Sequence, residues 1–259
     1  MPEGDAIPDR AAFVQPLDGA ELCLLYAAGK RPSADHIVRH AQRAQQARFG
    51  IAHQPSAAEG WVELLSNGLS FDCHGLAPAA GVAVPPRAQA FGLPKLIERR
   101  SFEAIGITPG PHLREGGPLL PIVRGLVGLG EQLAQMPGVN AVCWVPAASW
   151  MEPDYFARIA RDWLNGGVFP ALGLTSLERD DGGCITTCGL GYFTRQEVEF
   201  LPKQGASAAQ ATRLVVRLID ALVYSGPLSG ETTFAGPEGE VLEVSAPANG
   251  ATIRVNWVS

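Results

Sequence analysis

The clearest pattern of apolar and polar positions lies between residues 138 and 225. The run 141–145 (AVCWV) is short and apolar and is followed by a proline, which is typical of a buried strand. Apolar residues then recur every three or four positions over 152–164, behind an acid and a proline, and this spacing predicts an amphipathic helix. We therefore expect a strand followed by a helix.

A pair of strands is expected next. Residues 170–177 and 184–190 are rich in apolar and β-branched side chains, and the sequence Asp-Asp-Gly-Gly at 180–183 is typical of a turn. The two segments are predicted to pair as antiparallel strands.

Strict alternation marks further strands near the C-terminus. Residues 194–201 alternate between apolar and charged positions, which predicts a strand with one face in solvent. Residues 240–245 and 251–258 are predicted to form a hairpin through Asn249 and Gly250.

The most apolar helix of the chain is expected between these strands. Ser207 and Gln210 have the spacing of a capping box, in which the two side chains pair with the first free backbone groups of a helix. Aliphatic residues follow at helical spacing over 214–222. This helix is predicted to cover the sheet that the neighbouring strands form.

The N-terminal half begins in a similar way. Residues 21–28 are predicted as a strand, and Ser33 is predicted to cap a helix over 34–48. Strands over 61–65 and 69–73 are expected to form a hairpin, because the Asn-Gly pair between them is a strong turn signal.

The middle of the chain has fewer signals. Residues 75–117 are rich in Pro, Gly and Ala and are predicted to bridge the two halves over the surface, with a short helix near 91–102. Residues 118–136 are predicted as a helix, although its three glycines each cost about 1 kcal/mol relative to Ala. We expect these glycines to let another element approach closely.

The fold class predicted from these elements is α+β, with a mixed or antiparallel sheet and helices packed on one face. The expected organisation is an N-terminal arm over 1–18, a first half over 19–117 and a second half over 118–259. Both halves contain strand, helix and hairpin, and an offset of 119 residues aligns five identical positions. Two duplicated β-α-β-β halves are therefore one interpretation.

Composition and charge narrow the classes of function. The net charge of −6 argues against a nucleic-acid-binding protein, and no segment approaches the roughly 20 apolar residues of a membrane helix. The five cysteines are scattered and several lie in apolar runs, which is typical of reduced thiols in a cytoplasmic protein. We expect no membrane contact and no bound cofactor or metal.

Four residues are candidates for catalysis. Cys73 and His74 adjoin each other, and an imidazole near a thiol can activate it, although neighbours on a strand point to opposite faces. His36 and His40 lie four residues apart on a predicted helix, a spacing that suits a proton relay or a surface pair. No glutamate stands between them as in a zinc hydrolase.

Three residues are candidates for binding. Arg195, Glu197 and Glu199 share one face of the predicted strand over 194–201. A solvated face of this kind can contact a partner, and a carboxylate pair can transfer protons only where burial raises one pKa.

Part of the chain resembles a known family. Residues 187–193 (TCGLGYF), followed by 197–199 (EVE), look like a bacterial family of domains of unknown function, which has a Thr-x-Gly-Leu segment and then an acid-apolar-acid strand. The glycine-rich turn before 230–232 (GET) is similar as well. The resemblance covers 138–233 and implies an α+β domain without an established activity or known catalytic residues.

Two hypotheses on function remain open. The first is a non-catalytic binding or protein-interaction module with a protein partner and, through its exposed strand edges, a homodimer. The alternative is a small hydrolase or thiol-dependent enzyme with a site between the two halves.

Overall fold

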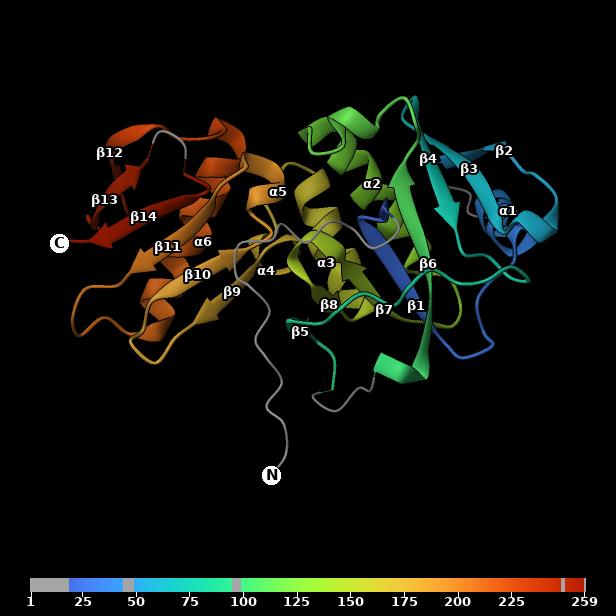
Figure 1. Cartoon of the computed structure of the whole chain (residues 1–259), viewed down its shortest axis with the longest axis horizontal. Helices are drawn as coiled ribbons and strands as arrows, with labels where there is room; N and C mark the ends of the chain where they lie inside the picture. The colour runs from blue at the N-terminus through green and yellow to red at the C-terminus, as the bar shows by residue number, and fades with distance from the viewer. Residues whose placement is uncertain (1–18, 44–48, 95–98, 248–249, 259) are drawn as a thin grey trace.

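The computed structural model describes residues 19–43, 49–94, 99–247 and 250–258. Its helices and strands form two sheets, shown in Figure 1. The strands of the first sheet are β1 (Leu22–Ala27), β2 (Phe49–His53), β3 (Trp61–Ser66), β4 (Leu69–His74), β5 (Gln89–Phe91), β6 (Phe102–Pro109), β7 (Val139–Trp144) and β8 (Ser149–Met151). The strands of the second are β9 (Ser176–Arg179), β10 (Ile185–Cys188), β11 (Glu197–Leu201), β12 (Gly230–Ala235), β13 (Val241–Ala246) and β14 (Thr252–Trp257).

Both sheets are mixed. The first has the order β2-β3-β4-β6-β1-β7-β8-β5, and its last pair, β8 and β5, is parallel. The second has the order β12-β13-β14-β11-β10-β9, and β11 and β14 are its parallel pair. The predicted α+β class is confirmed, with two sheets instead of one.

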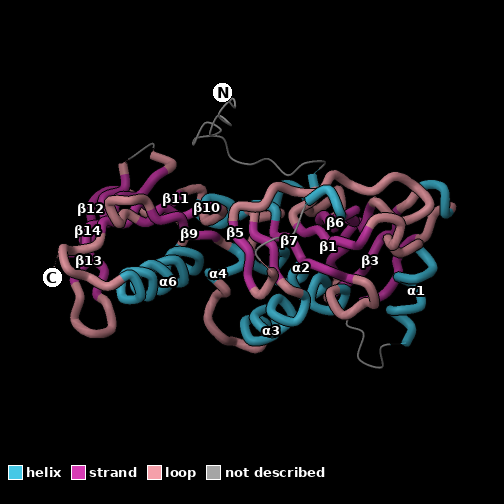
Figure 2. Tube along the Cα trace, turned by 90° about the horizontal axis from the view of Figure 1, so that it is seen from below, coloured by secondary structure: helices cyan, strands magenta, loops and turns pink. Residues whose placement is uncertain are grey.

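Six α-helices accompany the sheets within the described residues. They are α1 (Ala34–Arg43), α2 (Leu120–Leu133), α3 (Pro153–Leu164), α4 (Ala171–Leu174), α5 (Gly191–Thr194) and α6 (Ala208–Ser225). Figure 2 shows that α1, α2, α3 and α6 lie on one side of the layer of strands, as the amphipathic patterns predict. No described helix has both the length and the apolar character needed to cross a membrane.

The helix predicted to cover the C-terminal sheet does so. The capping box at Ser207 is present, with Gln210 donating its backbone N–H to the serine oxygen. The aliphatic face of α6 is buried, and it packs in one core with the inward residues of β11, β13 and β14. Ile253, Val255 and Trp257 alternate inward, which also confirms the predicted strand at the C-terminus.

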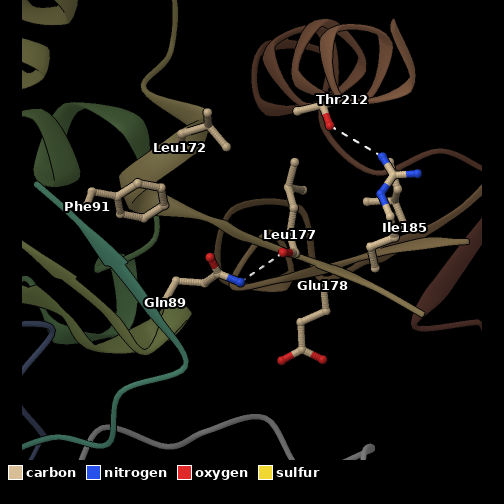
Figure 3. Close-up of a pocket in the computed structure, with 8 residues that line it drawn as sticks. Gln89, Phe91, Leu172, Leu177, Glu178, Ile185 and Thr212 are labelled. Carbon is tan, nitrogen blue, oxygen red and sulfur yellow. Dashed lines mark hydrogen bonds between the residues drawn. The ribbon is translucent and has the colours of Figure 1, made fainter. Parts of the chain in front are cut away.

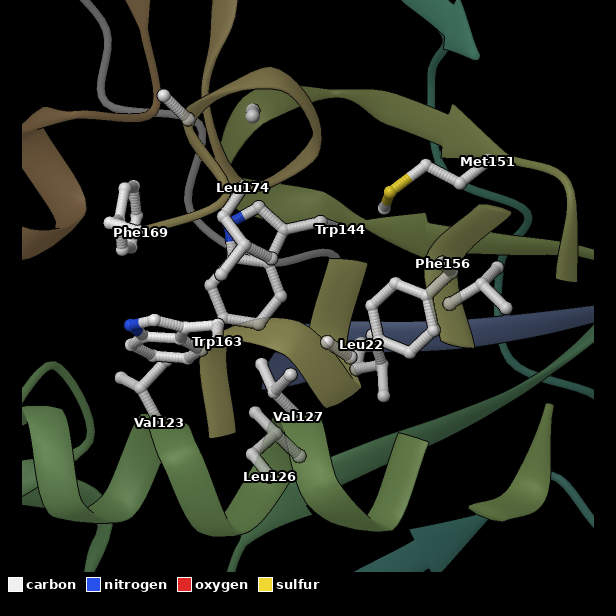
Figure 4. Packing of buried hydrophobic residues seen from close by; sticks show 14 of the residues in the cluster. Leu22, Val123, Leu126, Val127, Trp144, Met151, Phe156, Trp163, Phe169 and Leu174 are labelled. Atoms are coloured by element: carbon white, nitrogen blue, oxygen red, sulfur yellow. The ribbon is translucent and has the colours of Figure 1, made fainter. Parts of the chain in front are cut away.

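The core of the first sheet lies between its strands and the helices α2 and α3. Figure 4 shows Phe156 and Trp163 of α3 beside Leu22 of β1 and Val127 of α2. All four side chains are fully buried. Since β1 and β7 lie at the centre of the sheet, this contact fixes α2 and α3 across it.

The glycines of α2 allow the close approach that was expected. A Cβ at Gly130 would overlap Leu22 Cδ2 and lie 3.1 Å from Phe156 Cε1, and one at Gly125 would lie 2.9 Å from Phe71 Cζ. At Gly128 the nearest atom would be Leu164 Cδ1, at an ordinary contact distance of 3.6 Å.

These contacts predict opposite effects for two alanine substitutions in one helix. Gly130→Ala should lower the free energy of unfolding by about 2 kcal/mol, because overpacking outweighs the gain in helix propensity. Gly128→Ala should raise it by about 1 kcal/mol, because it gains propensity without a clash. Urea denaturation of the two variants measures both values, and equal effects would show that α2 does not approach the sheet this closely.

The N-terminal hairpin agrees with its turn signal. Asn67 and Gly68 have φ values of 51° and 79°, as a type I′ turn requires of both central residues. They join β3 and β4 in register. The predicted helix after Ser33 is present over 34–43, and the rest of its predicted length, like Asn249 in the C-terminal hairpin, lies outside the described residues.

The predicted surface bridge over residues 75–117 is wrong in part. Residues 102–109 form β6, which is paired on both sides by β1 and β4 and is nearly all buried. The segments on both sides of β6 are rich in Gly and Pro, so the sequence pattern of this strand was not recognised between them. The predicted helix near 91–102 is also absent from the described residues there, which contain the end of β5 and a 3-10 turn at 99–101.

The predicted strand over 170–177 is replaced by a short irregular helix and β9. Gly173 has a φ of 139°, which L side chains rarely adopt, and it interrupts the extended backbone. A Cβ there would lie 2.8 Å from Ile159 Cδ1, so the glycine also lets α4 pack against α3.

The two sheets do not divide where the sequence suggests a boundary. Strands β7 and β8, which follow residue 117, belong to the first sheet. Strands β1 and β7, which the 119-residue offset aligns, pair with each other as antiparallel neighbours. An internal duplication is not shown.

Candidate functional site

The edges of the two sheets meet at a cleft, which we call the junction cleft. Strand β5 is the last strand of the first sheet and β9 the last of the second. The cleft encloses about 200 Å³ and is lined by Gln89, Phe91, Leu172, Leu177, Glu178, Arg179, Ile185 and Thr212. Figure 3 shows Gln89 and Phe91 on the β5 side, Leu177 on β9 and Thr212 on α6.

Within the described residues, one side-chain hydrogen bond joins β5 to β9. The Gln89 side chain donates Nε2–H to the backbone oxygen of Leu177, at 2.9 Å (Figure 3). The Asp180 N–H donates to Cys184 O at 3.1 Å, so Asp180 forms a hydrogen-bonded pair with Cys184. In an antiparallel pair of strands, hydrogen-bonded residues alternate with residues whose backbone groups point away from the partner strand. Leu177, three positions before Asp180, therefore points its carbonyl away from β10. Gln89 therefore takes the place that a neighbouring strand would occupy.

The apolar wall of the cleft is held by α3. Tyr155 stacks on Phe91 with ring centroids 5.6 Å apart, and its hydroxyl donates to Leu172 O at 3.0 Å. Leu172 is 37% exposed. The cleft thus presents fixed apolar side chains to solvent beside an open strand edge.

The polar wall is also fixed. Arg179 donates to the backbone oxygens of Gly183 and Ala208, each at 3.2 Å, and contacts Thr212 Oγ1 at 3.5 Å. These contacts hold the Arg179 guanidinium on the α6 side of the cleft. The residues that line the cleft include neither a thiol nor an imidazole.

A larger hollow of about 420 Å³ lies between the β3–β4 turn and α2. Its charged residues are paired: Arg124 donates to Leu164 O at 3.0 Å, and Glu131 forms an ion pair with Arg161 at 2.6 Å. None of the described residues that line it lies on an edge strand, so the junction cleft is the better candidate for recognising another chain.

Cys73 and His74 do not form a reactive pair. Cys73 is fully buried in the core, and burial raises the pKa of its thiol to about 12. His74 lies on the other face of the sheet, where its Nε2 is 4.0 Å from Asp72 Oδ2. Burial lowers the pKa of His74, and the Asp72 charge opposes this shift.

His36 and His40 have separate partners. His36 Nδ1 lies 2.8 Å from Ser33 Oγ, and His40 Nε2 lies 3.1 Å from the backbone oxygen of Gln132. His40 also stacks on Phe49. Across the part of the chain that the structure describes, no group of three or more His, Cys, Asp or Glu side chains is placed to hold a metal ion.

Arg195, Glu197 and Glu199 do not share one solvated strand face. Arg195 has a φ of 61° and ends α5, so it precedes the strand and is exposed. Glu199 lies 3.6 Å from Arg254 in a partly exposed ion pair. Glu197 turns instead toward the loop that follows β10.

The Glu197 carboxylate accepts four hydrogen bonds, one from the end of β10 and three from the residues that follow it. The donors are Thr187 Oγ1 at 2.6 Å, the N–H groups of Gly189 and Gly191, both at 2.9 Å, and the Leu190 N–H at 3.2 Å. Burial raises the pKa of Glu197, while these hydrogen bonds lower it. The Thr-x-Gly-Leu segment and the acid of the next strand thus form one structural unit.

Sequence reasoning missed the residues of the junction cleft. Gln89 and Leu177 are 88 positions apart, and no local pattern links them. The sequence also predicted a surface bridge over 75–117 and a strand over 170–177. Because the structure differs in both segments, the sequence did not indicate the strand edges on which these residues lie.

Comparisons of the chain with family models, with curated proteins and with solved structures found no match. The resemblance of residues 138–233 to a bacterial domain family therefore stays a prediction.

Proposed function

We propose that this chain is a non-catalytic protein-interaction module that binds an extended segment of a partner protein in the junction cleft. The observation that supports this most is the pair of facing strand edges, joined by the Gln89 side chain instead of a strand. Open edges bind extended peptides through main-chain hydrogen bonds, and adjacent pockets select the side chains.

The size and lining of the cleft suit an anchor residue. A volume of about 200 Å³ is below the range of about 300 to 1,000 Å³ that is typical of small-molecule sites. Phe91, Leu172 and Leu177 give the cleft an apolar surface. We therefore expect the partner segment to insert an aliphatic or aromatic side chain and to pair its backbone with β9.

The alternative, a hydrolase or thiol-dependent enzyme, gains no support from this geometry. The cleft residues offer no nucleophilic thiol or imidazole base, and the Cys73 thiol is buried. None of the five cysteines, all of which lie in described segments, forms a disulfide, which supports a cytoplasmic location for the proposed module.

Peptide selection tests the proposal directly. A phage-displayed library of random peptides, selected on the wild-type protein, should yield sequences with one apolar anchor residue. Leu172→Arg places a charge in the cleft and should weaken binding of these peptides at least tenfold. The matched control is Leu201→Arg on β11, where the leucine is similarly exposed, at 43%, and does not line the cleft.

Hydrogen exchange adds a second readout. Bound peptide should slow exchange of the β9 amides and leave β12, the opposite edge of that sheet, unchanged. If selection yields no binder, or if the selected peptides bind Leu172→Arg as tightly as wild type, the junction cleft is not the binding site.

A further inference from the structure

One part of the first sheet has a face that no described element covers. On the face away from the helices, Val82, Val84 and Leu93 pack against residues of β1, β6, β7 and β8. They do not reach the other end of the sheet, where Leu65 of β3 is 46% exposed. Within the described residues, His53, Trp61, Glu63 and Leu65 on this face of β2 and β3 are therefore at least partly exposed, while Asp72 of β4 and Thr108 of β6 beside them are buried.

The strand register gathers six chemically active side chains on this face, which we call the Trp61 patch. Trp61 lies opposite His74, Glu63 opposite both His53 and Asp72, and Asp72 opposite Thr108. Residues directly opposite each other point to the same side of a sheet. The patch is thus His53, Trp61, Glu63, Asp72, His74 and Thr108.

Trp61 is the aromatic centre of the patch. Its ring centroid is 5.5 Å from that of His53 and 6.0 Å from that of His74. The chain has five tryptophans, all in described segments, and the other four are buried while Trp61 is partly exposed. An exposed indole flanked by carboxylates is suited to a cationic group.

Two polar groups of the patch lack a hydrogen-bond partner. Thr108 is 5% exposed, and its Oγ1 is buried without one. Asp72 is 8% exposed, and the Nε2 atom of its ion-pair partner His74 is 4.0 Å from its Oδ2 atom, beyond hydrogen-bonding distance. Because buried polar groups are normally paired, these two oxygens point to a ligand that donates hydrogen bonds.

We propose that the Trp61 patch binds an arginine side chain of a basic segment in a partner protein. The planar guanidinium stacks on the Trp61 ring and donates to the Asp72 and Glu63 carboxylates, with Thr108 Oγ1 as a further acceptor. Arginine suits this site better than lysine, because its fork of donors can stack and form paired hydrogen bonds at the same time.

The charge around the patch supports this ligand. Glu63 and Asp72 face each other across β3 and β4, and like charges directly opposite are unfavourable without a cation. Burial raises the pKa of Asp72, and the charges of His74 and Arg114 partly oppose this. Arg114, whose charge acts on Asp72, is itself exposed. This site does not depend on the junction cleft.

A short synthetic peptide with two arginines is the probe, and calorimetry follows its binding to every variant; a change in tryptophan fluorescence that Trp61→Phe abolishes assigns the contact to Trp61. The same peptide with citrulline, the neutral analogue of arginine, should not bind, and its lysine version should bind at least fivefold more weakly. The double variant Glu63→Gln with Asp72→Asn should lose at least tenfold in affinity. Trp61→Phe keeps a ring and should lose less.

The control for net charge is Glu231→Gln with Glu238→Gln, which removes two exposed carboxylates elsewhere and should bind as wild type does. Equal loss in the two double variants would show attraction by net charge alone and would overturn the proposal. Equal binding of the lysine and arginine peptides would overturn the assignment to arginine.

Discussion

Replacing Glu197 by alanine should destabilise the protein by about 4 kcal/mol. The side chain accepts hydrogen bonds from Thr187 Oγ1 and from three consecutive backbone N–H groups, those of residues 189–191. Alanine would leave these donors unpaired in a largely buried loop, and each lost partner of a buried donor costs about 1–3 kcal/mol before relaxation. Urea denaturation of the wild type and the variant measures the difference.

A neighbour on the same strand provides the matched control. Glu199 has an ion pair with Arg254 at 3.6 Å, and the side chains are 39% and 73% exposed. Glu199→Ala should therefore cost less than about 1 kcal/mol. Similar losses at positions 197 and 199 would mean that the Glu197 carboxylate does not hold the loop.

The contrast between these two glutamates shows what alternation can predict. It correctly predicts that Val198 and Phe200 face the core, because burial follows the period of a strand. The same alternation predicts one environment for both Glu197 and Glu199. What separates them is a loop that folds back over Glu197, and that loop depends on the positive φ of Gly189 and on its contact with Ala147, more than 40 positions away.

The same distinction explains which elements were predictable. The α6 face, the Asn67-Gly68 turn and the C-terminal strand carry their signals within a few residues, and all three were confirmed. Strand β6 was missed although it is central, because Gly106 and the flanking glycines and prolines weaken its pattern. The structure shows why a glycine is needed: a Cβ at 106 would lie 2.8 Å from Ala20 Cβ.

Neither proposed binding site has a local signature. The junction cleft depends on two sheet edges that meet only in the folded chain, and the Trp61 patch depends on the registers of β2, β3, β4 and β6. His74 was selected as a neighbour of Cys73, but the sheet places it with Asp72 and Trp61 instead.

Replacing Glu21 by glutamine should stabilise the protein by about 3 kcal/mol at pH 8 and leave its stability at pH 4 nearly unchanged. Glu21 precedes β1, is 8% exposed, and has a buried Oε2 without a hydrogen-bond partner. Burial raises its pKa from 4.5 to about 7, and a hydrogen bond from its own backbone and the Arg114 charge oppose this only in part. Each pH unit between the two values corresponds to about 1.4 kcal/mol.

The sign of the change in stability with pH follows from the proton that Glu21 retains in the folded chain. Below pH 4.5 the carboxyl group is protonated in both the folded and the unfolded chain, so it does not penalise folding. As the pH rises from 4.5 to 7, the unfolded chain releases the proton first and the free energy of unfolding falls. Glutamine removes this fall because it does not ionise.

Denaturation of the wild type and Glu21→Gln at several pH values tests this, with the exposed Glu231→Gln as the control for net charge. The difference between Glu21→Gln and the wild type should grow over the window from pH 4.5 to 7 and then stay constant, because titrations elsewhere in the protein affect both chains alike. A difference that is the same at pH 4 and pH 8 would mean that Glu21 is not held in its neutral form.

Tyr192 makes the test more specific. Its hydroxyl is also buried without a partner, and it lies close to Glu21: the Tyr192 hydroxyl and Glu21 Oε1 would each lie 3.7 Å from a Cβ at Gly117. Tyr192→Phe should therefore leave the pH window in place, since the desolvation of Glu21 by its surroundings, and not a bond to this hydroxyl, is what raises the pKa.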